Sequence, residues 1–115
     1  MSADPYSAKV RELFTEPAHA GDVAGGEAVS VADQDVRLRL SASVTGGNID
    51  TLRFRVWGCP QVIAAVEAVC SGLEGLPVTD LENYTAADVM QNLPVPVEKT
   101  GRILVIQDTV RSLGR

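Results

Sequence analysis

The sequence predicts an α+β fold: a small antiparallel sheet of about three strands with helices packed on one of its faces. Two runs in the first half of the chain alternate apolar residues with arginine or serine, as in strands that bury one face. Segments before and after these runs repeat apolar residues at helical spacing. With 115 residues and 45% hydrophobic content, the chain is expected to form a single domain, 1–115, around one core.

Residues 1–30 are expected to form a short N-terminal helix and a partly mobile loop. The segment from Tyr6 to Phe14 is amphipathic, because its large apolar residues fall on one side of a helix. The segment Pro17–Gly21 ends this helix and opens the loop. A short first strand is predicted near Val29–Val31.

Two longer strands joined by a tight turn are predicted next. The runs 36–42 and 52–56 alternate apolar and polar residues, and Thr45–Asn48 between them has the composition of a turn. Arginines occupy the outward positions of both strands. One face of the sheet is therefore expected to contact water.

The second half of the chain is predicted to be mainly helical. Apolar residues recur at helical spacing over 62–73, and glycines at and beyond its end act as stop signals. Thr85 and Asp88 form a capping-box pattern for a helix that ends near Asn92. The prolines of 93–97 predict an extended loop, and 103–113 form the last helix.

The composition argues against several classes of function. The net charge of −5 argues against a nucleic-acid partner, because no surplus of Lys and Arg is available to neutralise phosphates. No apolar run is long enough for a membrane span, and the N-terminus lacks the features of a signal peptide. The two cysteines are expected to stay reduced, which favours a cytoplasmic location.

The segment Arg53–Pro60 is the most informative part of the chain. It predicts a strand that delivers Cys59 to the start of a helix, with Pro60 at the first helical position. A thiolate at that place faces unpaired backbone N–H groups and the positive end of the helix dipole. Cys59 is therefore predicted to be a metal ligand or a nucleophile.

Several segments carry, in order, the motifs of one protein family. Glu16–Gly21 resembles an N-P-x-N-x-G loop, Arg53–Cys59 matches an R-F-x-x-x-G-C segment, and Ile63-Ala64 follows it. Leu93–Lys99 resembles an expanded L-P-P-V-K loop. Over nearly its full length, the chain thus resembles the IscU/NifU N-terminal family of iron–sulfur cluster assembly scaffolds, which implies an IscU/NifU-like fold.

The resemblance implies a ligand set that this chain retains only in part. The family offers three cysteines, an aspartate in a C-G-D element, and a histidine just before the third cysteine. Cys59 matches one cysteine and Asp35 the aspartate, whereas Asp33 stands at the first cysteine. Gly101 and Arg102 stand at the histidine and the third cysteine, which is the family's usual sulfur acceptor. Persulfide transfer by the ordinary route is therefore not expected.

The candidate cofactor-binding and metal-binding residues are accordingly Cys59, Asp35 and Asp33. One thiolate and two carboxylates are a poor match for an iron–sulfur cluster, which is usually held by four mostly thiolate ligands. Asp33 and Asp35 are two residues apart on a predicted strand or strand entry, so both could face the side of Cys59. The alternatives are an iron–sulfur cluster, an iron or zinc ion, and a metal-free pocket in which Arg102 pairs with the carboxylates.

Three classes of function remain open. The first is a divergent scaffold that needs an exogenous thiol or a second protomer to complete ligation. The second is a non-ligating paralogue that binds and regulates the assembly machinery. The third, a thiol enzyme that uses Cys59, is least favoured because no histidine base is placed beside it. The chain is therefore expected not to be an enzyme.

The resemblance also implies two partners, a cysteine desulfurase and an Hsp70-type chaperone. The family's chaperone-docking loop corresponds here to Leu93, Pro94, Val95, Pro96, Val97 and Lys99. Its two prolines favour an extended segment that loses little entropy on binding in a groove. An inserted residue changes the spacing of the motif, so weakened recognition is expected.

Three other residues receive structural interpretations. Cys70 falls on the apolar side of a predicted helix and is expected to be a small core residue. His19 has no partner motif and is interpreted as a loop residue. Trp57 is expected to be either a core residue or a surface aromatic that faces a partner.

Overall fold

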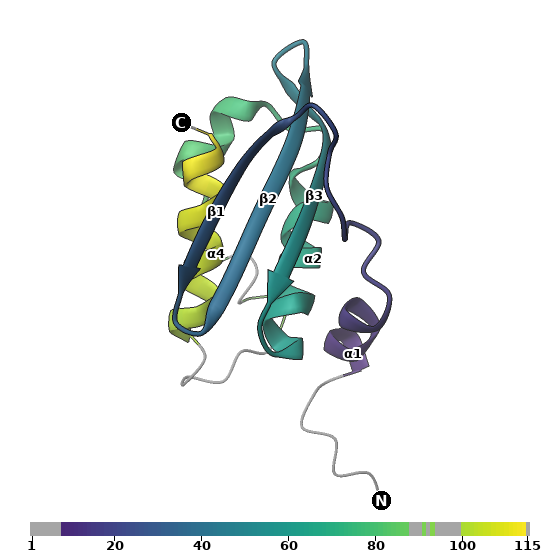
Figure 1. The fold of residues 1–115 in the computed structure, drawn as a ribbon, viewed down its shortest axis with the longest axis vertical. Coiled ribbons are helices and arrows are strands. Elements are labelled where there is room, and N and C mark those ends of the chain that lie inside the picture. The colour runs from purple at the N-terminus through teal and green to yellow at the C-terminus, as the bar shows by residue number, and fades with distance from the viewer. Residues whose placement is uncertain (1–7, 88–90, 92, 94–99, 115) are drawn as a thin grey trace, which may run out of the picture.

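Three antiparallel strands form one sheet, and the helices lie behind and beside it (Figure 1). The computed structural model describes residues 8–87, 91, 93 and 100–114. The elements follow in the order α1 (Ala8–Thr15), β1 (Glu27–Asp33), β2 (Val36–Thr45), β3 (Asn48–Trp57), α2 (Pro60–Leu73), the 3₁₀ helix η1 (Val78–Asn83) and α4 (Thr100–Leu113). This architecture confirms the predicted α+β class.

The sheet has the strand order β1-β2-β3, with a two-residue turn at each junction. Gly46 and Gly47 connect β2 and β3 with φ angles of 61° and 83°, a region that glycine adopts without steric cost. The predicted turn at Thr45–Asn48 is therefore confirmed. The other turn, Gln34–Asp35, also has positive φ although neither residue is glycine.

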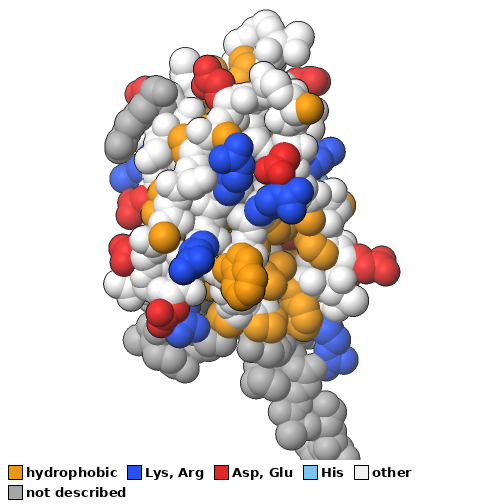
Figure 2. Space-filling view, in the orientation of Figure 1, with side chains coloured by type: hydrophobic (Ala, Val, Ile, Leu, Met, Phe, Trp, Pro, Cys, Tyr) orange, Lys and Arg blue, Asp and Glu red, His pale blue; other side chains and the backbone are white. Residues whose placement is uncertain are grey.

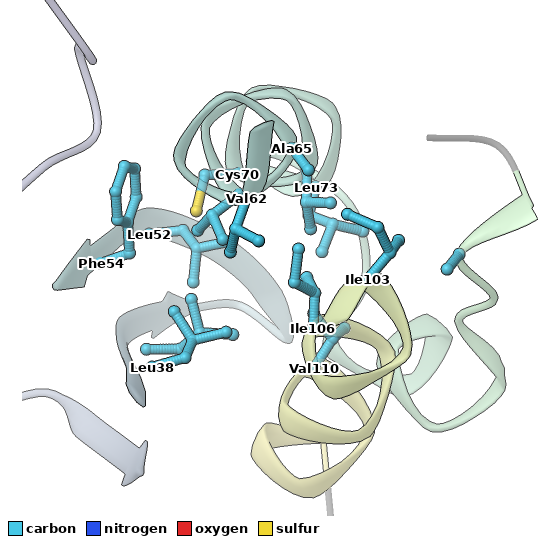
Figure 3. Packing of buried hydrophobic residues seen from close by; sticks show 14 of the residues in the cluster. Leu38, Leu52, Phe54, Val62, Ala65, Cys70, Leu73, Ile103, Ile106 and Val110 are labelled. Atoms are coloured by element: carbon cyan, nitrogen blue, oxygen red, sulfur yellow. The ribbon is translucent and has the colours of Figure 1, made fainter. Parts of the chain in front are cut away.

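The inner face of the sheet forms the core with α2 and α4 (Figure 3). Leu38 on β2 and Leu52 and Phe54 on β3 are at most 2% exposed. They point toward buried residues of the two helices, among them Val62 and Ile106 (Figure 3). The alternation that predicted these strands has thus placed their apolar residues on one face.

The helices divide the sheet between them. α4 packs on β1 and β2, α2 packs on β3, and α1 packs on α2. α2 begins with Pro60 in its first turn and ends before Glu74 and Gly75. Gly75 has a φ of 89°, so it ends the helix in the conformation typical of a glycine stop signal.

Some predictions for the second half of the chain differ from the structure. The 3₁₀ helix η1 was not predicted, and half of the helix predicted from Thr85 to Asn92 lies outside the described residues. Leu93 is only 1% exposed and belongs to the core, so its assignment to an exposed docking loop is wrong. Pro94, Val95, Pro96, Val97 and Lys99 of that loop lie outside the described residues. Where the chain is described, no helix is long and apolar enough to cross a bilayer.

Candidate functional site

Cys59 is the N-cap residue of α2, at the junction with β3. Its backbone is extended, and its carbonyl oxygen accepts hydrogen bonds from the N–H groups of Val62 and Ile63 at 2.9 and 3.1 Å. The preceding residue has to be small, because a Cβ on Gly58 would lie 3.3 Å from the side chain of Val62. The predicted place of Cys59, at the start of the helix, is confirmed.

The two cysteines have different surroundings, and neither forms a disulfide. Cys59 is half-buried, whereas Cys70 in the last turn of α2 is fully buried in the core. Burial raises the pKa of the Cys70 thiol, and the nearby charges of Glu67 and Glu74 raise it further. Cys70 is therefore a structural residue, as predicted.

Asp33 and Asp35 flank Gln34 in the turn between β1 and β2. Gln34 and Asp35 have φ angles of 51° and 61°, so the alternation of a regular strand does not apply to them. The argument that Asp33 and Asp35 face Cys59 because they are two apart on a strand is therefore wrong. Oδ1 of Asp33 accepts a hydrogen bond from the N–H of Gln34 at 2.9 Å, which stabilises the turn.

Both aspartates nevertheless lie close to the strand that leads to Cys59. They line an open pocket of about 610 Å³ together with Ala32, Val36, Arg37, Trp57 and Gly58. The pocket thus joins the β1–β2 turn to the end of β3. The carboxylates and the start of α2 lie at the same end of the sheet.

The start of α4 lies beside the same turn. A Cβ on Gly101 would lie 3.3 Å from Oε1 of Gln34, so the glutamine side chain contacts the helix there. Arg102, the next residue, is half-buried. It makes no ion pair with Asp33 or Asp35 in the described part of the chain, so the expected pairing is not found.

The positions that the sequence analysis matched to ligands, which are 33, 35, 59, 101 and 102, therefore lie at one end of the molecule. Few of the side chains at these positions can donate an atom to a metal. Within the described residues, no group of three or more His, Cys, Asp or Glu side chains is arranged to hold a metal ion. The set Cys59, Asp33 and Asp35 thus does not form a complete metal site in this arrangement.

His19 forms an interaction that the sequence analysis missed. Nδ1 of its imidazole lies 2.5 Å from Oε2 of Glu67, and Nε2 lies 2.8 Å from Oε1 of Glu74. The backbone N–H of His19 also donates to Oε1 of Glu67 at 2.8 Å. The interpretation of His19 as a loop residue without a partner is therefore wrong.

Glu74 connects His19 to the sheet. Its Oε2 accepts hydrogen bonds from the N–H of Leu52 at 2.8 Å and from the Arg53 guanidinium at 3.0 Å. Burial opposes protonation of His19, but hydrogen bonds to Glu67 and Glu74 outweigh it and raise the pKa of the imidazole. Burial also works against ionisation of Glu74, but these hydrogen bonds and the His19 contact lower its pKa.

A sequence signal for this cluster existed. Glu67 lies within an otherwise apolar run that forms a buried helix face, and a buried glutamate needs a charged or hydrogen-bonding partner. The chain has one histidine, His19, which was the natural candidate. The sequence did not show that the loop returns to α2.

Comparison with known proteins agrees with this fold. The family model described as NifU-like N terminal domain matches residues 5–112. The bifunctional protein NifU/MnmA of Rubrobacter xylanophilus is 31% identical over 97 residues, which cover 80% of this chain but only 20% of that protein. The mitochondrial iron sulfur cluster assembly protein 1 of Eremothecium gossypii is 24% identical over 115 residues, covering 93% of this chain and 75% of that protein.

Solved structures show the same fold at low sequence identity. An N-terminal NifU-like protein from Brucella abortus superposes with a TM-score of 0.71 and 14% identity, covering 93% of this chain and 90% of its own. A SUF-system scaffold protein described as putative, from Fervidobacterium islandicum, gives a TM-score of 0.62 at 14% identity, covering 91% and 81%. These likenesses concern the arrangement of the chain alone.

Proposed function

This chain belongs to the family of NifU-like N-terminal domains, and we propose that it acts in iron–sulfur cluster assembly as a divergent scaffold with an incomplete ligand set. The match covers nearly the whole chain, and one similar curated protein is named for iron–sulfur cluster assembly. Iron and the cluster are the cargo of such a scaffold. The chain would bind them without catalysing a reaction of its own.

The observation that carries this proposal is the position of Cys59. Cys59 is the N-cap residue of α2, where the positive end of the helix dipole lies near its side chain, and its thiol makes no capping hydrogen bond. Cys70 is buried in the core and cannot take part. One protein thiolate does not hold a cluster that needs about four ligands, so a small thiol or a second protomer would supply the others.

A second candidate function is that of a non-ligating paralogue that binds and regulates the machinery. Gly101 and Arg102 at the matched positions favour it, because glycine has no donor and an arginine guanidinium stays protonated and does not ligate. The partners would be a cysteine desulfurase and an Hsp70-type chaperone. Pro94–Lys99 is the segment whose sequence suggests a docking site for the chaperone.

A thiol enzyme is disfavoured by the arrangement of the described residues. A catalytic cysteine needs a base within hydrogen-bond reach, and histidine is the usual one. The one histidine of the chain, His19, is engaged on both ring nitrogens by Glu67 and Glu74. It does not serve Cys59.

Anaerobic reconstitution separates the two candidate functions. The protein is incubated with ferrous iron and sulfide, with and without glutathione, and passed through gel filtration while visible absorbance is recorded. A divergent scaffold retains absorbance with glutathione, or as a dimer without it, and loses it in Cys59→Ser, whereas Cys70→Ala behaves as the unmodified protein. Absence of retained iron under both conditions would favour the regulatory paralogue.

A further inference from the structure

The outer face of the sheet, opposite the helices, is unusual for a chain with a net charge of −5. Arg37 and Arg39 on β2 and Arg55 on β3 project from it and form what we term the basic patch. In Figure 2, Lys and Arg side chains gather over the strands, and hydrophobic side chains adjoin them. Three of the ten basic residues of the chain are therefore concentrated on one small area.

The basic patch has little compensating charge. Arg39 and Arg55 are directly opposite each other in the register of β2 and β3, an arrangement that repels. They share one carboxylate, because Asp22 pairs with Arg55 and, at 3.3 Å, with Arg39. Arg37 makes no ion pair within the described residues. The patch thus retains positive charge toward solvent.

Trp57 stands at the end of the patch, opposite Arg37, and is 79% exposed. Exposure of so large an apolar side chain is unfavourable in isolation, and Trp and Arg are both among the residues enriched at the hot spots of protein interfaces. On one side of Trp57 lies a groove of about 420 Å³ over β1 and β2, whose lining includes Ser30, Ala32 and the basic patch. The small side chains of β1 leave this groove open.

On its other side, Trp57 borders a hollow of about 370 Å³ between β3, α1 and the loop before β1, lined by apolar side chains and by Arg55. Phe14, Pro17 and Ile63 are among the residues that line it. Trp57 therefore lies between a groove that contains the three arginines and a hollow lined mainly by apolar side chains, and Arg55 borders both. One ligand that crosses Trp57 would meet positive charge first and apolar surface next.

We propose that this face docks an extended acidic segment of a partner protein, with carboxylates on the basic patch and an adjoining apolar side chain in the hollow beside Trp57. Charge complementarity selects the acidic segment, because the chain as a whole repels anions and the patch attracts them. Arg37 and Arg39 are two residues apart on one strand, about 6.8 Å. An extended segment with acidic residues at alternate positions has the same repeat.

The neighbouring carboxylates limit where the segment can lie. Asp33 and Asp35 line the pocket beyond Arg37 and Trp57, at the turn between β1 and β2. They would repel an acidic segment that continued toward the turn. The segment therefore runs from Arg39 and Arg55 across Trp57 toward the hollow, and this docking does not depend on cluster ligation.

Single-stranded nucleic acid is the other occupant that arginines and an exposed aromatic on a sheet could suit. The net charge of −5 disfavours a strand with a phosphate at every nucleotide more than it disfavours a peptide with only a few carboxylates. A second copy of this chain could also present acidic residues to the patch. The experiment described next distinguishes nucleic acid and a second copy of the chain from the acidic segment.

Trp57 is the single tryptophan of the chain, so its fluorescence reports on the proposed surface directly. The probe is a short synthetic peptide with glutamates at alternate positions and leucines at one end, titrated at low salt. A saturable change in emission is expected, and salt should weaken it. Arg37→Glu should weaken binding about tenfold or more.

The control is Arg111→Glu, which makes the same charge change on α4, behind the sheet, and also removes the hydrogen bond from the guanidinium to the carbonyl oxygen of Tyr84. It should bind the peptide as the unmodified protein does, with circular dichroism confirming that both variants are folded. Trp57→Phe, followed by calorimetry, should also weaken binding. Equal affinity of Arg37→Glu and Arg111→Glu, or no saturable signal, would overturn the proposal. So would tighter binding of a single-stranded oligonucleotide, or an emission change that depends on protein concentration alone.

Discussion

Cys59 and Cys70 share a helix but differ in exposure, and that difference predicts their reactivity. We expect iodoacetamide to alkylate Cys59 in the folded protein and to reach Cys70 only after unfolding. The reason is that Cys70 is fully buried and its thiol pKa is raised, whereas Cys59 is half-buried at a helix N-terminus. Timed labelling with mass mapping measures both rates in one sample.

The control for this experiment is the variant Cys70→Ala, which should take up label at the same rate as the native protein, at one site. Labelling in urea should reach both cysteines of the unmodified chain. Native labelling of Cys70 as fast as Cys59 would show that the assignment of roles is wrong.

His19 is the residue whose interactions predict a dependence of stability on pH. Replacing it with alanine removes the imidazole contacts to Glu67 and Glu74 and leaves Glu67, which is 6% exposed, with the backbone N–H of residue 19 but without its charged partner. Hydrogen bonds between charged groups are worth about 1.5–3 kcal/mol each in such positions, so His19→Ala should lower the free energy of unfolding by about 2–3 kcal/mol. Urea unfolding at pH 6 measures this loss.

The free energy of unfolding that is lost in His19→Ala should become smaller as the pH rises. A raised pKa means that the folded protein binds a proton more tightly than the unfolded chain, whose histidine titrates near 6.5. The stabilisation is therefore complete below pH 6.5 and disappears as the pH rises through the higher folded value. Glu74, with a lowered pKa, adds stability above its ordinary 4.5 that is lost in acid. If the free energies of unfolding of the unmodified protein and of His19→Ala differed by a constant amount from pH 6 to pH 9, this account would be contradicted.

At the scale of an element, the turn between β1 and β2 has a backbone conformation that its residue types do not favour. Asp35 adopts a φ of 61°, which costs about 1 kcal/mol for a residue other than glycine. Asp35→Gly should therefore raise the free energy of unfolding by about 0.5–1 kcal/mol. Thermal or urea unfolding measures the change.

The matched control is Asp50→Gly, because Asp50 is exposed within β3, where glycine should destabilise. If Asp35→Gly were instead destabilising, the carboxylate of Asp35 would have to make a stabilising contact that outweighs its backbone strain. In that case its role at the site would be structural.

At the scale of the whole molecule, three elements converge at one end of the sheet: the β1–β2 turn, the start of α2 and the start of α4. This convergence predicts that the missing donors can be restored. The combined variant Asp33→Cys, Gly101→His and Arg102→Cys should retain iron or zinc through gel filtration far better than the unmodified chain. The new histidine would displace the side chain of Gln34, which lies 3.3 Å from a Cβ at position 101.

The control for the restored variant adds Cys59→Ser, which should lose most of the retained metal. Metal content by mass spectrometry and cluster absorbance are the two measurements. If the unmodified protein, freed of added thiols, already kept a stoichiometric cluster that Cys59→Ser abolished, the interpretation of an incomplete ligand set would be wrong. The plain scaffold function would then hold.

The sequence by itself determined the features that depend on local patterns. Alternating apolar residues placed β2 and β3, a pair of glycines placed their turn, and Pro60 with an apolar period placed α2 and so Cys59 at its start. Each of these follows from backbone geometry over a few residues, which a sequence records directly. The burial of Cys70 follows from the same helical period.

Only the tertiary structure decided the features that join distant residues. His19 meets Glu67 and Glu74 across 48 and 55 positions of the chain, and no local pattern encodes which loop returns to α2. Likewise, both core and surface positions were open to Trp57, and its exposure depends on the absence of a covering element among the described residues. The turn at Gln34–Asp35 lacks glycine, so the pairing of β1 with β2 imposes a positive φ that residue preferences alone would not predict.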